Sequence, residues 1–259
     1  MSLAIIPVSL TLSLAPAPLE KVSINLRKVW QESHIGLIGA ITTGLVTGAF
    51  WSLGPVYARA EAFDTFQLTL FMSIIVFGGA VFQLPLGRIS DSYDRRIVVF
   101  YSALSASVIS VLMVILPPLW PQFDHWLLIM LAFFWGGSVM TQYAVCLAHA
   151  NDRAAPEDFV MVGSGMLLTL GLCSAIGAPL ASLTMRFIGA SGLFVFSAIC
   201  MYLYAWVIAV RIRTHVLPQE TINEPFRAVA DMTTPAVYEM DPRTSEEAQI
   251  VAEENQAQA

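Results

Sequence analysis

Apolar residues of this chain gather in six long runs that are separated by polar and charged residues. The runs are Ile35–Tyr57, Phe66–Leu86, Ile97–Leu116, Trp126–Ala150, Phe159–Phe187 and Gly192–Val210. Each is close to the roughly 20 residues that a helix needs to cross about 30 Å of hydrocarbon. None of them alternates apolar and polar positions as the strands of a membrane barrel do. The pattern predicts an all-α integral membrane protein with six transmembrane helices in a bundle, over residues 35–211.

The segments on either side of this bundle have a different character. Residues 1–14 are apolar but short and contain Pro7, so we interpret them as the remnant of a truncated transmembrane helix. Residues 15–34 are predicted to be a cytoplasmic connector, with an amphipathic stretch on the membrane surface that contains Val22, Leu26, Val29 and Trp30. Residues 212–259 are rich in acids. They are predicted to be a disordered cytoplasmic tail, with a docking segment as the alternative.

Glycine and proline residues occur within the predicted spans. The glycines Gly44, Gly48, Gly163, Gly165, Gly171 and Gly177 give small faces where two helices can approach closely. Pro55, Pro85 and Pro179 are expected to bend or end their helices.

Composition agrees with a membrane protein. The chain has 259 residues, of which 56% are hydrophobic and 12% charged, and its mean hydropathy is +0.68. A soluble protein of this length could not enclose so much apolar surface. The net charge of -6 and the sequence pI of about 5.1 give no support to nucleic-acid binding.

The basic residues predict an orientation. If the segment Gly87–Arg96 is cytoplasmic, only Arg59 and Arg186 of the 13 Lys and Arg residues lie outside. Cytoplasmic loops carry the excess of Lys and Arg, so the connector and the C-terminus are predicted to be inside.

No pattern of catalytic or metal-binding residues stands out. Cys146, Cys173 and Cys200 lie inside predicted spans and read as small buried side chains. The histidines lie at or beyond span ends without metal-ligand spacing, and His149 is interpreted as an interfacial anchor. HExxH and Walker motifs are absent from the sequence. We therefore expect no enzyme activity, no cofactor and no metal.

The densest charge cluster is GRISDSYDRR, from Gly87 to Arg96, between the second and third spans. In it a glycine is followed four residues later by Asp91, and four residues beyond by the pair Arg95 and Arg96. A small residue such as Gly87 lets adjacent helices meet, and a carboxylate such as Asp91 suits a helix N-terminus. The arginines could pair with carboxylates on the same side, at Asp152, Glu157 and Asp158. Such contacts, made in one conformation and broken in another, would form a latch, whereas a solvated turn is the simpler interpretation.

This cluster, with the preceding GGAVFQLPLG, resembles the signature loop of the major facilitator superfamily of transporters. Ser92 stands where that family often has a basic residue, and Asp94 where it usually has glycine. Asp tolerates left-handed turns better than most residues, so the turn could survive. The chain is particularly similar to uncharacterised bacterial members, and this resemblance implies a location in the inner membrane of a bacterium.

The resemblance implies the second six-helix half of a twelve-helix fold. In that family the substrate binds between two halves near the middle of the bilayer. The corresponding cavity helices here are the first and fourth spans. Their polar and tryptophan residues on one face are the candidate substrate contacts, namely Thr43, Thr47, Trp51, Trp135, Ser138 and Gln142. For Thr43, Thr47 and Ser138, hydrogen bonding between helices is an equal alternative.

The predicted function is secondary transport of a small solute by alternating access, without ATP. The chain is expected to be inactive alone, because transport would require a missing N-terminal half or another chain as its partner. Membrane lipid is the other expected partner. No Asp or Glu lies deep in a span, so a coupling carboxylate is not evident. The alternative is a non-transporting membrane interaction subunit or a degenerate transporter fragment.

Overall fold

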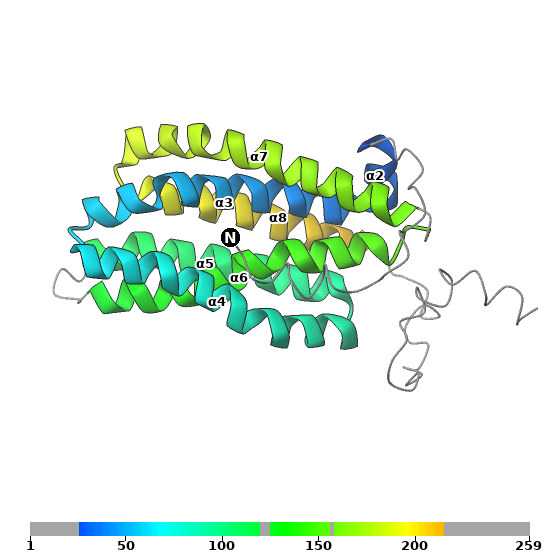
Figure 1. The fold of residues 1–259 in the computed structure, drawn as a ribbon, viewed down its shortest axis with the longest axis horizontal. Helices are drawn as coiled ribbons and strands as arrows, with labels where there is room; N and C mark the ends of the chain where they lie inside the picture. The colour runs from blue at the N-terminus through cyan, green and yellow to red at the C-terminus, as the bar shows by residue number, and fades with distance from the viewer. Residues whose placement is uncertain (1–25, 120–124, 156–157, 215–259) are drawn as a thin grey trace, which may run out of the picture. The chain divides into compact units, whose positions relative to one another are not determined.

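The computed structural model describes residues 26–119, 125–155 and 158–214. These residues form helices and short connections, without a strand among them. The helices are α2 (Leu26–Glu32), α3 (His34–Ala60), α4 (Thr65–Ser92), α5 (Arg95–Leu119), α6 (His125–Asn151), α7 (Phe159–Ile188) and α8 (Gly192–Thr214) (Figure 1). Helices α3 to α8 are all long and apolar enough to cross a membrane, which confirms the predicted class. The predicted remnant at 1–14 and nearly all of the acidic tail lie outside the described residues.

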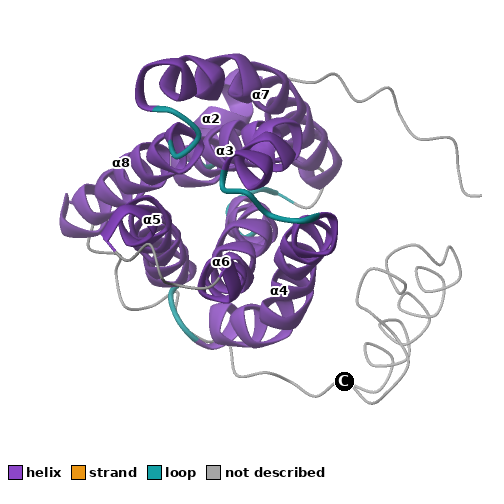
Figure 2. Ribbon diagram, turned by 90° about the vertical axis from the view of Figure 1, so that its left-hand side faces the viewer, coloured by secondary structure: helices purple, strands orange, loops and turns teal. Residues whose placement is uncertain are grey.

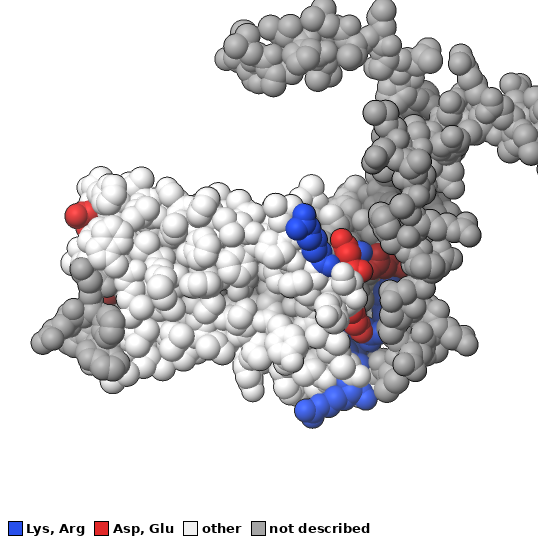
Figure 3. All heavy atoms as spheres, turned by 90° about the horizontal axis from the view of Figure 1, so that it is seen from below, with Lys and Arg blue, Asp and Glu red and all other residues white. Residues whose placement is uncertain are grey.

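Charged side chains lie toward the ends of these helices, and the visible face in Figure 3 has an uncharged band between them. We call the end that carries the α4–α5 turn the Arg95 end, and the end that carries the start of α6 the His125 end. Each long helix runs from one end to the other, so neighbours in sequence are antiparallel. Among the described residues, Arg59 and Arg186 belong to the His125 end and the other basic residues to the Arg95 end.

Polar side chains set several helix boundaries. Asp64 accepts from the backbone N–H of Gln67 (2.7 Å), and the Gln67 side chain accepts from the Asp64 N–H (3.1 Å), which closes a capping box at the start of α4. The hydroxyl of Ser33 accepts from the N–H of Gly36 (3.0 Å) and caps α3. Pro55 and Pro85 lie inside continuous helices, as does Pro179, so the expectation that they could end their helices is not met.

The most extensive helix contacts are those of α3 with α7 and of α4 with α6. In each pair, glycines bring backbones into contact. A Cβ on Gly48 would strike the backbone of Ser174, and one on Gly177 would strike Leu45. In the other pair, a Cβ on Gly136 would strike the backbone of Ile75, and one on Gly78 would strike Phe133. Such close approach is the role that small residues have in membrane helix pairs.

The two pairs repeat each other in register. Residues 45 and 48 of α3 are equivalent to residues 133 and 136 of α6, with a constant difference of 88 in residue number. Residues 174 and 177 of α7 are equivalent in the same way to residues 75 and 78 of α4, with a constant difference of 99. Helices α3 and α6 run in opposite directions, so α3–α5 and α6–α8 are inverted copies of one three-helix unit. In Figure 2, α3 and α6 lie in the middle, α5 and α8 on the left, and α4 and α7 at the outer right and top.

Serines on α5 join it to its neighbours. Ser102 donates to the carbonyl of Ser138 on α6 (2.7 Å), and Ser107 donates to the carbonyl of Ala198 on α8 (3.0 Å). Ser110 lies 3.0 Å from the hydroxyl of Ser197. Since each of these groups is buried and paired, the α5 side of the bundle is held by satisfied polar contacts.

Candidate functional site

The segment Gly87–Arg96 is largely helical. α4 continues through Ser92 and α5 begins at Arg95, which leaves only Tyr93 and Asp94 between them. The connection is therefore shorter than the segment between the predicted spans, because the polar residues continue the helix beyond the apolar run. The turn also does not use a left-handed residue at Asp94, since Ala62 is the one non-glycine residue of the described chain with positive φ. Instead, the Asp94 carboxylate accepts from the backbone N–H of Arg96 (2.9 Å) and caps α5.

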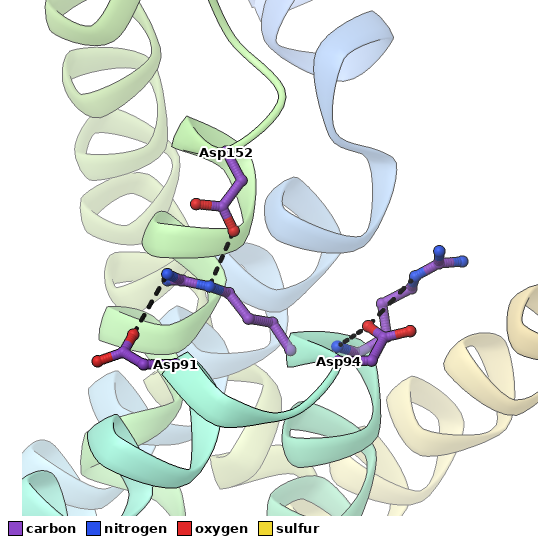
Figure 4. A network of polar contacts seen from close by, with 5 residues as sticks. Asp91, Asp94 and Asp152 are labelled. Carbon is purple, nitrogen blue, oxygen red and sulfur yellow. Dashed lines mark hydrogen bonds and ion pairs between the residues drawn. The ribbon is translucent and has the colours of Figure 1, made fainter. Parts of the chain in front are cut away.

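Arg95 ties this turn to the end of α6 (Figure 4). Its Nε lies 2.8 Å from Oδ2 of Asp152, just beyond α6, and its Nη2 lies 3.3 Å from Oδ1 of Asp91. The Asp152 side chain is 50% exposed and that of Asp91 is 71% exposed. Ion pairs of this kind contribute about 0–1 kcal/mol, so the contact can be made and broken at little cost. Burial raises the pKa of the Asp152 carboxyl, and the neighbouring Arg95 guanidinium lowers it in part.

The other predicted members of the latch are arranged differently. Arg96 is buried, and its Nε lies 3.5 Å from Oδ1 of Asp94. Asp158 contacts Lys28 of α2, with 2.6 Å between Nζ and Oδ2, although it was expected to face Arg95 and Arg96. Glu157 lies outside the described residues. The structure thus brings one of the predicted carboxylates, Asp152, to Arg95.

Gly87 is open on the side where a Cβ would stand. No atom of the described residues lies within 4 Å of that position. The expectation that Gly87 lets α4 and α5 approach each other is therefore wrong. Gly163 and Gly171 on α7 are open in the same way, whereas Gly44, Gly48, Gly165 and Gly177 face neighbouring helices as expected.

α2 lies against the start of α7. Val29 is fully buried and contacts the Gly165 position, while Leu26 is 40% and Trp30 41% exposed. The ion pair between Lys28 and Asp158 reinforces this contact. Of the four apolar residues predicted for the amphipathic stretch, Val29 is buried, Leu26 and Trp30 are partly exposed, and Val22 lies outside the described residues.

The candidate substrate residues divide by exposure. Trp135 is buried, and its Nε1 donates to Ser110 Oγ (2.9 Å) and Ser197 Oγ (3.2 Å). Ser138 is also buried and lies 2.9 Å from the hydroxyl of Ser105. Their polar groups contact α5 and α8, and the Trp135 ring also packs against Phe50 of α3, with ring centroids 5.0 Å apart. Sequence alone gave no sign of this, except that serines recur along the third apolar run.

Two of the three α3 candidates, Thr47 and Trp51, are partly exposed. Thr47 is half-buried and donates to the carbonyl of Thr43 (2.7 Å), and Trp51 is 48% exposed. Since these two side chains are partly accessible on the described bundle, a solute beside α3 could reach them.

Thr43 and Gln142 lie at one level of the α3–α6 contact. Gly36 of α3 faces Ala150 of α6, and Phe50 faces Trp135. Because the two helices are antiparallel, the residue numbers of each facing pair add to 185 or 186. By this register Thr43 is opposite Gln142. Both are buried, and Thr43 Oγ1 and both amide atoms of Gln142 have no hydrogen-bond partner among the described residues. Each such buried orphan atom costs about 1–3 kcal/mol, so the level has an unused capacity for hydrogen bonding.

His149 lies on the same face of α6, seven residues beyond Gln142 and level with Gly36. Its side chain is buried, and its Nε2 also has no hydrogen-bond partner within the described chain. The interpretation of His149 as an interfacial anchor is therefore wrong, since an anchor would be exposed at the membrane surface.

A second cluster of titratable residues lies at the His125 end. His125 Nε2 donates to the carbonyl of Glu61 (3.0 Å), and its ring lies 4.6 Å from that of Phe63. Burial raises the pKa of the Glu61 carboxyl, and His125 lowers it in part. This contact joins the end of α3 to the start of α6.

Comparison with known proteins gives a single family. A model of the major facilitator superfamily matches residues 9–240. An uncharacterised MFS-type transporter, YcaD of Escherichia fergusonii, is 23% identical over 174 residues, which cover 67% of this chain and 43% of the relative. YcaD of Salmonella paratyphi B is 23% identical over 182 residues, which cover 70% and 45%. The chain thus spans less than half the length of these relatives. No solved structure matches it.

Proposed function

The chain belongs to the major facilitator superfamily, and we propose from this membership that it forms one six-helix half of a secondary transporter for a small solute. The observation that carries the proposal is the repeat of glycine contacts between α3–α5 and α6–α8. Inverted three-helix repeats within a six-helix half are the architecture of these transporters. The half is proposed to be the second one, with the Arg95 end in the cytoplasm and the protein in the bacterial inner membrane.

Transport requires a second bundle in this proposal. The solute is bound between two six-helix bundles that rock against each other, and the described chain supplies one. The α3 side chains Thr47 and Trp51 would contact the solute first, because they are partly exposed. Gln142 and Thr43 would contribute hydrogen bonds once α3 and α6 separate slightly, because their polar atoms have no other partner.

The contact of Arg95 with Asp152 and Asp91 serves as the latch. It joins the α4–α5 turn to the end of α6, so movement of α4 and α5 relative to α6 breaks it. Because the carboxylates are half or more exposed, water replaces the lost contact at a cost of about 1 kcal/mol or less. A contact of that strength biases two conformations without preventing their exchange.

Accessibility labelling tests the proposal without knowledge of the solute. Thr47→Cys and Trp51→Cys, in a chain without its native cysteines, are treated with a membrane-impermeant maleimide in right-side-out and inside-out vesicles. Alternating access predicts labelling from both sides. Leu203→Cys on α8 is the control, because this exposed apolar residue is expected to face lipid and should not be labelled from either side. Labelling of Thr47→Cys and Trp51→Cys from one side only contradicts the proposal.

The latch is tested in the same vesicles. Asp91→Asn or Asp152→Asn should change the ratio of labelling from the two sides while leaving the amount of protein in the membrane unchanged. Identical ratios in wild type and both variants would remove these carboxylates from the mechanism. Separately, solute uptake or efflux by liposomes that contain only the monomeric chain would contradict the requirement for a second bundle.

A further inference from the structure

The turn between α3 and α4 contains a strained residue. Ala62 has a φ of 60° and is the one non-glycine residue with positive φ in the described parts of the chain. Glycine adopts this left-handed conformation freely, whereas a Cβ strains it. Backbone hydrogen bonds close the turn, from the N–H of Ala62 to the carbonyl of Arg59 (3.1 Å) and from the N–H of Phe63 to the carbonyl of Ala58 (3.0 Å). Strained residues of this kind persist only where their surroundings hold them, and they occur at switch regions.

Two contacts hold this turn against the bundle. Phe63 is 2% exposed, and its ring lies 5.5 Å from that of Phe71 on α4 and 4.6 Å from that of His125 on α6. The Nε2 atom of His125 also lies 3.0 Å from the carbonyl oxygen of Glu61. Since a carbonyl oxygen only accepts, Nε2 carries the proton and donates it. The α3–α4 turn is thereby fixed to the first residue of α6, which lies at the same end of the bundle (Figure 1).

The Glu61 carboxyl lies beside this contact in surroundings that favour its neutral form. The side chain is partly buried, and burial raises the pKa of the carboxyl, while the charge of His125 lowers it in part. Tyr57, one helical turn earlier, is fully buried. Its hydroxyl interacts electrostatically with the Glu61 carboxyl and has no hydrogen-bond partner among the described residues. The closed turn therefore binds a proton on Glu61 more tightly than a turn opened to water would.

The remaining charged residues at this end do not replace His125 as the neighbour of Glu61. Those within the described chain are exposed, namely Arg59, Asp64 and Arg186. Asp64 is engaged in the capping box of α4. Asp124 precedes His125 in sequence and lies outside the described residues. Of the charged groups that the structure describes, His125 is the one that acts on the Glu61 carboxyl from a neighbouring helix.

We propose that Glu61 is a proton-binding site that controls closure of the His125 end. With the proton bound, the carboxyl stays beside Tyr57, His125 keeps its hydrogen bond to the carbonyl, and Ala62 keeps its left-handed conformation. When the carboxyl releases its proton to water, the resulting carboxylate is solvated better outside the turn than within it, so the side chain moves outward. That movement releases the strain at Ala62 and withdraws the carbonyl from His125. The end of α3 then separates from the start of α6.

Closure of this end is expected to weaken as the pH rises. Because the pKa of the Glu61 carboxyl is raised in the closed turn, closure is favoured below the ordinary Glu pKa and is lost as the pH rises through the raised value. The His125 end faces the outside of the cell in the proposed transporter, so an acidic exterior keeps it closed. This effect on transport rests on the proposed function, whereas the proton site belongs to the single bundle.

Hydrogen exchange of the turn amides tests the proposal. The N–H groups of Glu61, Ala62 and Phe63 are bonded in the closed turn and exchange when it opens. The full chain in nanodiscs is measured by mass spectrometry across the acidic and neutral range, with correction for the intrinsic pH dependence of exchange. Protection should fall in one step in the wild type and stay at its low-pH level in Glu61→Gln, whose neutral amide has no proton to lose.

Arg59→Gln is the matched control, because it removes an exposed charge from the same turn and should keep the step of the wild type. Protection that does not change with pH in the wild type, or a step that survives in Glu61→Gln, would overturn the proposal.

Two further variants test the contacts around Glu61. His125→Ala removes the charge that lowers the pKa of the Glu61 carboxyl, so the step should extend to higher pH while protection falls at every pH. Ala62→Gly removes the strain and should slow exchange about fivefold at every pH, which corresponds to about 1 kcal/mol. A step at the wild-type pH in His125→Ala, or an unchanged exchange rate in Ala62→Gly, would contradict the proposal.

The outcomes are distinct from those on transport. An exchange step that depends on Glu61, in a chain whose Thr47→Cys is labelled from one side only, would refute the transport function and leave the proton site standing. Labelling of Thr47→Cys from both sides, in a chain whose turn protection does not respond to pH, would refute the proton site and support transport.

Discussion

The contact of Gly177 with the backbone of Leu45 gives a sharp prediction for stability. We compare Gly177→Ala with Gly163→Ala, which lie on the same helix, α7. A Cβ at Gly177 would collide with the Leu45 carbonyl and lie 2.9 Å from its Cα, and these backbone atoms cannot move alone. A Cβ at Gly163 has no described atom within 4 Å.

The two substitutions share every other effect. Replacing Gly by Ala in a helix gains about 0.8–1.0 kcal/mol of helix propensity at either site. At Gly177 the helices must also separate, and overpacking of this kind costs about 1–3 kcal/mol. Gly177→Ala should therefore be less stable than Gly163→Ala by about 1–3 kcal/mol. For a domain of about 150–250 residues that difference corresponds to roughly 2–12 °C in Tm.

Thermal unfolding of the purified variants in one detergent, followed by tryptophan fluorescence, measures the difference. The inverted repeat adds a second arm, since Gly78→Ala on α4 is the equivalent change against Phe133 and should resemble Gly177→Ala. Equal melting temperatures for Gly177→Ala and Gly163→Ala would show that α3 and α7 do not meet at this glycine, and the register of the bundle would have to be revised.

Three further predictions concern polar groups. Burial raises the pKa of Asp152 in the folded protein. Its contribution to stability is therefore greatest below the ordinary Asp pKa and is lost as the pH rises through the raised value. Asp152→Asn should remove this component when the free energy of unfolding is measured across the acidic range, and an unchanged pH profile would contradict the prediction. Gln142→Leu should leave the Tm unchanged or raise it, because it removes a buried amide that has no hydrogen-bond partner among the described residues. The same variant should abolish transport, as measured with a solute that the wild type carries. A fall in Tm would show that the amide is paired. Trp135→Phe should lower stability by about 0.5–1.5 kcal/mol in chemical unfolding, because Ser110 and Ser197 lose the indole donor but keep their contact with each other. Equal stability would mean that the indole hydrogen bonds contribute nothing.

The spans were predictable because twenty-residue apolar runs have few alternatives in a membrane protein. Their ends were less predictable. α4 extends six residues past the predicted end at Leu86, because Gly87–Ser92 is polar but still helical. Hydropathy marks where a helix leaves the bilayer, whereas the capping side chain of Asp94 marks where the next helix starts.

The ion pairs of the α4–α5 turn were predicted in part for a similar reason. Sequence distance placed Asp152 and Asp158 on the same side as Arg95, but it could not show that Lys28 of α2 contacts Asp158. The side on which an acid lies follows from topology, while its partner depends on the angle at which each helix ends. Open glycines such as Gly87 were likewise invisible, because sequence shows that a residue is small and not whether anything fills the space beside it.

α6 unites these observations, because its buried polar side chains differ in whether they have hydrogen-bond partners. Toward α5 and α8, Trp135 and Ser138 are hydrogen bonded to serines, so separating these helices would expose several paired groups at once. Toward α3, Gln142 has no hydrogen-bond partner among the described residues, and moving α3 away would cost it none. A conformational change that opens the bundle therefore meets less resistance along α3 and α6 than along α5 and α8. If transport moves α3 against α6, a crosslink between Ser110→Cys and Ser197→Cys should leave labelling of Thr47→Cys unchanged, whereas a crosslink between α3 and α6 should abolish it from one side.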